Sequence, residues 1–157
     1  MDLEKYQQYS RIARGLEKAD LVLKDARIVN VFTEEIIRGD IAIQDGIIAG
    51  IGSFHGKEER DLAGKYVCPG FIDSHLHLES TLVTPAELVT VASRPGTTTF
   101  IVDPHESANV SGLAGIDYIL DQTEDVKANV YVMMPSCVPA TSIDDNGCTL
   151  TAEDMAP

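Results

Sequence analysis

The sequence predicts an α/β protein in which a β-rich segment precedes a run of alternating strands and helices. Short β-branched runs separated by turn residues fill positions 20–67, and strand-like and helix-like segments alternate from position 68 onward. Strands that alternate with helices are typical of βα units, whose strands pair in parallel. The 157 residues are enough to bury a core, and we expect three parts: a helix in 1–19, a partial sheet in 20–67 and three βα units in 68–157.

In the first part of the chain the spacing of apolar residues changes once, from helix-like to strand-like. Residues 3–19 place apolar side chains at roughly helical spacing, which predicts a short amphipathic helix. The following β-branched runs are residues 21–23, 27–32, 39–43 and 46–52. Gln44-Asp45-Gly46 is a tight-turn signal. These runs predict a small meander of antiparallel strands that ends near Val67.

The second part alternates strands and helices after Cys68-Pro69-Gly70. Thr84 is suited to be an N-cap, with Pro85 at the first helical position and Glu87 at the third, which together predict a capping box. The predicted elements are a strand at 71–77, a helix at 84–92, a strand at 97–103, a helix at 110–122 and a strand at 128–134.

Charge and cysteine content exclude several classes of function. Lys and Arg number 12 against 25 Asp and Glu, a net charge of −13 that repels phosphate backbones and anionic lipid. We therefore expect no nucleic-acid or membrane partner. The chain carries no signal-peptide pattern or long apolar run, so a cytoplasmic location is expected. Cys68, Cys137 and Cys148 form no C-x-x-C, which argues against a disulfide framework or a thiolate zinc site.

A row of ionisable side chains marks the strand at 71–77. Side chains two residues apart on a strand point to the same face, so Asp73, His75 and His77, with Glu79 beyond them, would share one face. The alternate positions are mostly apolar. Burying such a row of ionisable groups without partners costs roughly several kcal/mol, and a divalent cation would relieve that cost. Imidazole nitrogens suit Zn, Fe or Mn.

A second polar cluster follows the next predicted strand. Asp103, His105 and Glu106 lie where that strand ends. Ligand-binding groups of parallel α/β folds gather at the carboxyl ends of strands, so we expect these three on the same edge as His75 and His77. They are the candidate catalytic residues.

The segment Pro69–His77 resembles the first barrel strand of the metal-dependent amidohydrolase superfamily. Residues 75–81, 103–106 and 135–140 are similar to strand ends of its adenine deaminase family. The resemblance implies that 20–67 is the N-terminal part of a composite β-sandwich and that 68–157 forms the first three βα units of a (β/α)8 TIM-type barrel, incomplete in this chain.

The resemblance also implies an activity, the hydrolysis of adenine to hypoxanthine and ammonia at a divalent metal, Mn or Fe with Zn as an alternative. His75 and His77 match its first-strand metal ligands, and Asp103, His105 and Glu106 match a motif at the active-site mouth. Because the family's later strands are missing, we expect an N-terminal fragment, or a degenerate relative, that is inactive alone and self-associates or forms a homo-oligomer. The alternatives are an amidohydrolase acting on a cyclic amide, such as a dihydroorotase or hydantoinase, and a non-catalytic α/β module.

Overall fold

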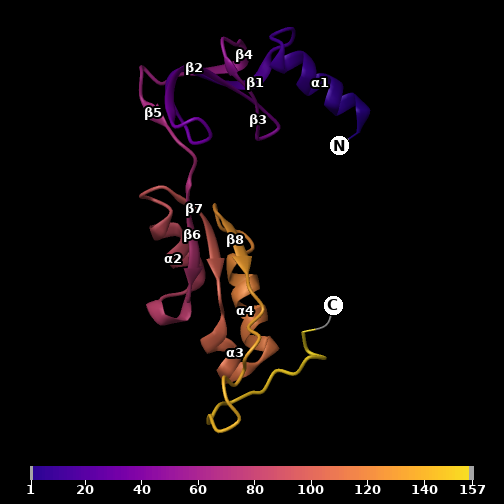
Figure 1. Cartoon of the computed structure of the whole chain (residues 1–157), viewed down its shortest axis with the longest axis vertical. Coiled ribbons are helices and arrows are strands. Elements are labelled where there is room, and N and C mark those ends of the chain that lie inside the picture. The colour runs from indigo at the N-terminus through magenta and orange to yellow at the C-terminus, as the bar shows by residue number, and fades with distance from the viewer. Residues whose placement is uncertain (1, 156–157) are drawn as a thin grey trace. The chain divides into compact units, whose positions relative to one another are not determined.

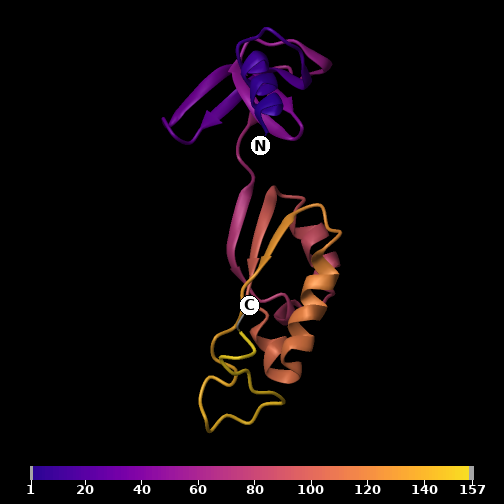
Figure 2. The ribbon, with the colours of Figure 1, turned by 90° about the vertical axis from the view of Figure 1, so that its right-hand side faces the viewer.

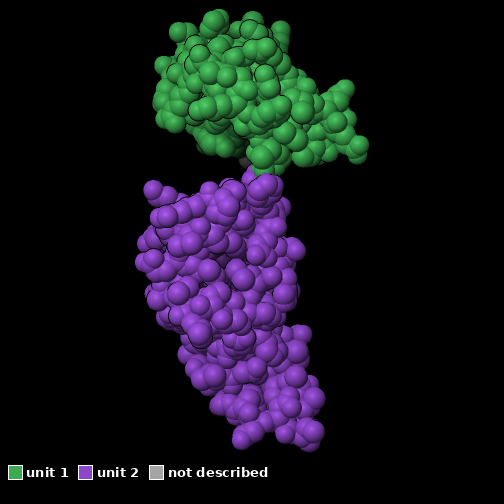
Figure 3. Space-filling model, turned by 90° about the vertical axis from the view of Figure 1, so that its left-hand side faces the viewer, with its two compact units in different colours: residues 1–69 green, residues 70–157 purple. Residues whose placement is uncertain are grey.

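The computed structural model describes residues 2–155 and is traced from end to end in Figure 1. The chain divides into two compact units, Met1–Pro69 and Gly70–Pro157, coloured green and purple in Figure 3. The first is mostly β-sheet, and the second alternates strands with helices. Within the described residues, no helix has the length and apolar character needed to cross a membrane. All three cysteines are free.

The first unit begins with helix α1 (Leu3–Ala13). Asp2 is its N-cap and accepts a hydrogen bond from the Lys5 backbone N–H at 2.8 Å. The helix ends at Ala13 instead of continuing to residue 19, because Gly15 takes a positive φ of 71° that breaks the helical geometry. Ile12 is fully buried and anchors α1 on the sheet against Val22 and Phe54.

The sheet of the first unit has the order β3-β2-β1-β4, with β5 also paired to β1. Its strands are β1 (Ala19–Asn30), β2 (Glu35–Gln44), β3 (Ile47–Gly52), β4 (Gly56–Asp61) and β5 (Tyr66–Val67). The predicted turn at Asp45-Gly46 is confirmed, because both residues have the positive φ that a two-residue hairpin loop requires. The expected all-antiparallel meander is wrong for its last two strands: β4 and β5 both run parallel to β1.

A buried ion pair ties the strands of this sheet together. Asp40 is 8% exposed and accepts hydrogen bonds from Lys24 Nζ and from the backbone N–H groups of Asp25 and Phe54. Lys24 also donates to the Phe54 carbonyl at 2.8 Å. Burial raises the pKa of Asp40, but these donors outweigh it, and the net effect lowers the pKa below its ordinary value of 3.8.

Replacing Asp40 with alanine is expected to lower the free energy of unfolding by about 3 kcal/mol at pH 7, because Lys24 would be left half-buried without its partner. A lowered pKa in the folded state means that this stabilisation is present above about pH 4 and is lost as the pH falls through the folded value. The loss should therefore shrink at pH 3, as measured by denaturant unfolding.

The control for Asp40 is Arg38→Ala, which removes an ion pair to Asp25 whose two side chains are 70% and 40% exposed. An exposed pair is worth only about 0–1 kcal/mol. An Asp40→Ala variant that loses no more stability than Arg38→Ala, or loses as much at pH 3 as at pH 7, would contradict this account.

The second unit is built on a parallel sheet of order β6-β7-β8, as the alternation of elements predicts. Its strands are β6 (Phe71–Leu76), β7 (Thr97–Val102) and β8 (Asn129–Val132). Helices α2 (Pro85–Ala92) and α4 (Leu113–Thr123) cover one face of this sheet (Figure 2). The core between them contains Val89 of α2, Ile119 of α4 and Phe100 of β7.

Two local expectations for this unit need correction. Thr84 is the N-cap of α2 with Pro85 following, but its side chain makes no capping hydrogen bond, so the capping box is not formed. The single helix expected at 110–122 is two helices, α3 (His105–Ser111) and α4, which Gly112 separates. Gly112 has φ 62° and ψ −137°, a conformation open to glycine and costly for other residues.

Candidate metal centre

The candidate site lies where β6 and β7 end. His75 is the second-last residue of β6, His77 follows that strand directly, and Asp103 follows β7 directly. Leu76 pairs with Val102, and the Asp103 backbone N–H donates to the Leu76 carbonyl at 2.9 Å. Parallel pairing therefore brings the three candidate side chains to one edge of the sheet, at the carboxyl ends of its strands.

The ligand atoms of these three residues converge. One ring nitrogen of each histidine and a carboxylate oxygen of Asp103 all lie within 4.8 Å of one another. The Nε2 atoms of His75 and His77 are 3.2 Å apart, and the two rings meet edge to face at an angle of 82°. Among the described residues, this is the cluster of His, Cys, Asp and Glu groups whose geometry suits a metal ion.

The backbone fixes which nitrogen of His77 is free. His77 Nδ1 lies 2.8 Å from the Asp103 carbonyl oxygen. A carbonyl oxygen only accepts, so Nδ1 carries the hydrogen and donates it. The lone pair of His77 is then on Nε2, the atom that faces His75. A ring held in this way by a hydrogen bond from its other nitrogen is typical of metal-ligating histidines.

The spacing of the donors fits a divalent cation. With metal–nitrogen bonds of about 2.0–2.1 Å, two nitrogens on one ion lie roughly 2.9–3.4 Å apart, and the two Nε2 atoms are 3.2 Å apart. A direct hydrogen bond between the two imidazoles would explain that distance equally well. Asp103 favours the cation, because its Oδ1 is buried without a hydrogen-bond partner among the described residues. A carboxylate that has one such unpaired oxygen and lies within 4.8 Å of two imidazole nitrogens fits a cation.

The other predicted site residues lie around this cluster without joining it. Asp73 accepts from the His75 backbone N–H at 3.3 Å, so its carboxylate braces the strand. Glu79 lies beyond the end of the strand, in the 3-10 helix η1 (Glu79–Thr81), where the alternation of faces no longer holds. His105 and Glu106 open α3; His105 is half-buried, and the exposed Glu106 accepts from Ser80 Oγ.

No local pattern in the sequence indicates the long-range contacts of two residues at this edge, Ser80 and Ser107. Ser80 bonds Glu106, and the Ser107 backbone N–H donates to Glu79 at 3.0 Å. Each contact spans 26 or 28 residues. Such bonds depend on the pairing of β6 with β7, and a local sequence motif does not predict that pairing.

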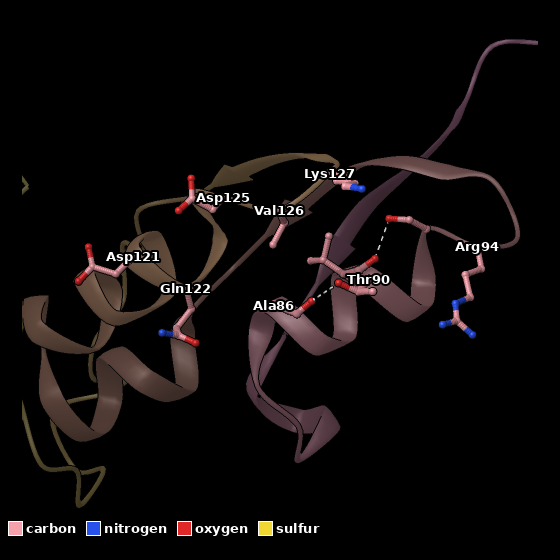
Figure 4. Close-up of a pocket in the computed structure, with 10 residues that line it drawn as sticks. Ala86, Thr90, Arg94, Asp121, Gln122, Asp125, Val126 and Lys127 are labelled. Atoms are coloured by element: carbon pink, nitrogen blue, oxygen red, sulfur yellow. Dashed lines mark hydrogen bonds between the residues drawn. The ribbon is translucent and has the colours of Figure 1, made fainter.

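A hollow of about 630 Å³ in the second unit lies elsewhere, between α2 and the end of α4. Figure 4 shows Thr90 and Arg94 on the α2 side and Asp121 and Gln122 on the α4 side. Thr90 Oγ1 donates back to the Ala86 carbonyl of its own helix. None of the three metal-centre residues lines this hollow, so its position gives no support to a catalytic role for it.

Comparison with known proteins finds relatives that match nearly the whole chain. Adenine deaminase of Desulfitobacterium hafniense is 61% identical over 143 residues, which cover 91% of this chain and 25% of that protein. Adenine deaminase of Clostridium acetobutylicum is 54% identical with the same coverage, and that of Listeria monocytogenes is 50% identical over 99% of this chain and 27% of its own. The chain thus spans about a quarter of the length of these relatives.

Among solved structures, N-acyl-D-glutamate deacylase from Bordetella bronchiseptica matches 55% of this chain and 19% of its own at 31% identity. Its TM-score of 0.43 is too low to establish a common fold. The family model for amidohydrolases matches residues 66–155, which include β6, β7, β8 and all three residues of the candidate metal centre. The chain belongs to the amidohydrolase family.

Proposed function

We propose that the whole protein is a hydrolase of a C–N bond that converts adenine and water to hypoxanthine and ammonia at a divalent metal centre. The convergence of the His75, His77 and Asp103 ligand atoms within 4.8 Å carries the proposal. Its substrate rests on the relatives that bear the name adenine deaminase, at 61% and 54% identity.

In this proposal His75 and His77 hold the cation through Nε2, and Asp103 adds a carboxylate oxygen. Imidazole and carboxylate donors suit Mn or Fe, and Zn as well. When bound, a divalent cation supplies hydroxide at neutral pH by lowering the pKa of water to about 7. The chain itself contributes the orientation: the Asp103 carbonyl holds His77, and the β6–β7 pairing holds Asp103 against both rings.

On the substrate side of this edge, His105 and Glu106 are proposed to act next to Asp103, whose carboxylate holds the cation. Hydrolysis adds the oxygen of water to C6 of the purine, breaks the bond to the exocyclic amino group, and delivers a proton to the departing nitrogen. The imidazole of His105 and the exposed carboxylate of Glu106 can hydrogen-bond the purine nitrogens or carry that proton. Both belong to the first turn of α3, which begins two residues after Asp103.

We further propose that the two units are the start of a composite β-sandwich and the first third of a (β/α)8 barrel. Tyr131 of β8 is 61% exposed and Phe71 of β6 is equally exposed, as expected if further strands cover them. Residues 1–157 alone should then show no deamination and should self-associate through this apolar surface. In the whole protein we propose a cytoplasmic location, a homo-oligomer, and no nucleic-acid or membrane partner, in line with the net charge of −13.

The substrate is tested on the purified whole protein loaded with Mn²⁺ or Fe²⁺. The ultraviolet spectrum should shift from that of adenine to that of hypoxanthine, while dihydroorotate and hydantoin stay intact in parallel assays. A site that hydrogen-bonds the purine nitrogens should reject such cyclic amides strongly, because its own polar groups would be left unpaired. Turnover of either amide with none of adenine would show that adenine is not the substrate, without contradicting the proposed metal centre.

A further inference from the structure

We propose that Glu79 is a positioning residue that fixes Asp103 against the two histidines. The proposal rests on the metal centre proposed above and adds a residue to it. Glu79 has no ligand atom in the His75, His77 and Asp103 cluster. It acts instead on the start of α3, the helix that follows Asp103 by two residues.

The start of α3 lacks a cap of its own. Its N-cap residue is Pro104, which makes no side-chain hydrogen bond to the helix. The first backbone N–H groups of a helix have no partner within it. Glu79 fills this place from another part of the chain: its Oε1 accepts from the Ser107 backbone N–H at 3.0 Å, across 28 residues. A carboxylate acceptor makes this bond stronger than one between neutral groups.

Glu79 is itself held firmly. Leu78 before it is 1% exposed and packs in the core of the second unit. Thr81 closes the turn over it, since its hydroxyl donates to the Leu78 carbonyl at 2.6 Å and its backbone N–H donates to the same oxygen at 3.2 Å. The carboxylate therefore extends from an anchored turn. Because that turn is fixed, the bond to Ser107 can determine the position of α3.

The bond from Glu79 completes a set of links between the two strand ends. Asp103 N–H donates to the Leu76 carbonyl, and the Asp103 carbonyl accepts from His77. These two bonds fix only the backbone of Asp103 on the side of β7. Glu79 fixes the chain on the other side of Asp103, at Ser107. The backbone is thus held on both sides of Asp103. Its carboxylate lies beside the two imidazoles although no donor among the described residues bonds to Oδ1.

The contact with Ser107 uses only one of the two carboxylate oxygens of Glu79. Its second oxygen, Oε2, is buried and has no hydrogen-bond partner among the described residues. A buried, unpaired carboxylate oxygen is unfavourable. The hydrogen bond to Ser107 requires one oxygen acceptor only, which a glutamine also provides. Glutamine and alanine at this position therefore separate the positioning hydrogen bond from the remaining properties of the side chain.

The test compares Glu79→Ala and Glu79→Gln in the whole protein by titration with Mn²⁺ against a competing chelator. Removing a residue that orients metal ligands typically weakens metal binding about 10–100-fold, and we expect a loss in that range for Glu79→Ala. Glu79→Gln should stay within about threefold of the unmodified protein because the Ser107 bond survives. In both variants kcat for adenine should follow Mn²⁺ affinity, while KM changes little.

The control is Thr123→Val, which removes a buried hydroxyl that donates to the Ile119 carbonyl within α4. It should lower the melting temperature without changing the affinity for Mn²⁺. If Glu79→Ala lowers only the melting temperature, as the control does, the positioning role is wrong. If Glu79→Ala does not fold, Glu79→Asp replaces it: the shortened side chain should weaken Mn²⁺ binding severalfold, and unchanged affinity would overturn the proposal. If the unmodified protein binds no Mn²⁺, the proposed metal centre itself is wrong.

Discussion

The double substitution of His75 and His77 by alanine is expected to remove the bound divalent metal and to lower adenine turnover at least about a thousandfold in the whole protein. Both Nε2 atoms face the same point, 3.2 Å from each other. Loss of both imidazoles leaves Asp103 as the remaining member of the cluster. This part of the protein would then offer a single carboxylate, whereas a tight site normally has three or more protein ligands.

Elemental analysis of the purified double variant measures the metal, and the adenine assay measures turnover. His55→Ala is the matched control, since the His55 side chain is 82% exposed and belongs to the first unit, where it contacts Glu59. That variant should keep full metal content and full turnover. Retention of all metal by the double variant would show that the histidines are not its ligands.

Much of the fold follows from local signals in the sequence. The Asp45-Gly46 turn and the Thr84-Pro85 helix start lie where the residue types predict them, because positive φ and a fixed proline φ are properties of single residues. The direction of β4 and β5 does not follow from such signals. After β3 the chain moves to the far edge of β1 and pairs in parallel, a choice made by tertiary packing.

The candidate site was only partly predictable for a similar reason. His75 and His77 are two residues apart on one strand end, so the alternation of faces brings their rings together. The same rule extended to Glu79 assumes a strand that in fact ends at Leu76. Asp103 was expected on this edge because parallel strands end together, and its carboxylate does lie with the histidines. Its backbone contacts to Leu76 and His77 required the register of β6 and β7.

Replacing Asp103 with asparagine is expected to weaken Mn²⁺ binding about 10–100-fold and to lower adenine turnover about a thousandfold. Asparagine has nearly the same shape, and the main-chain bonds of residue 103 to Leu76 and His77 are unaffected by it. The change therefore removes the negative charge that faces the imidazoles and little else. Asp117→Asn, an exposed position on α4, is the matched control and should change neither quantity.

The stability of the metal-free Asp103→Asn protein distinguishes a ligand from a structural carboxylate. Asp103 Oδ1 is buried without a hydrogen-bond partner among the described residues, so in the absence of metal the charge is unfavourable. The metal-free variant should melt at the same temperature as the unmodified protein or higher, and added Mn²⁺ should raise its melting temperature less. A variant that melts lower without metal and responds fully to Mn²⁺ would show that Asp103 supports the fold and not the cation.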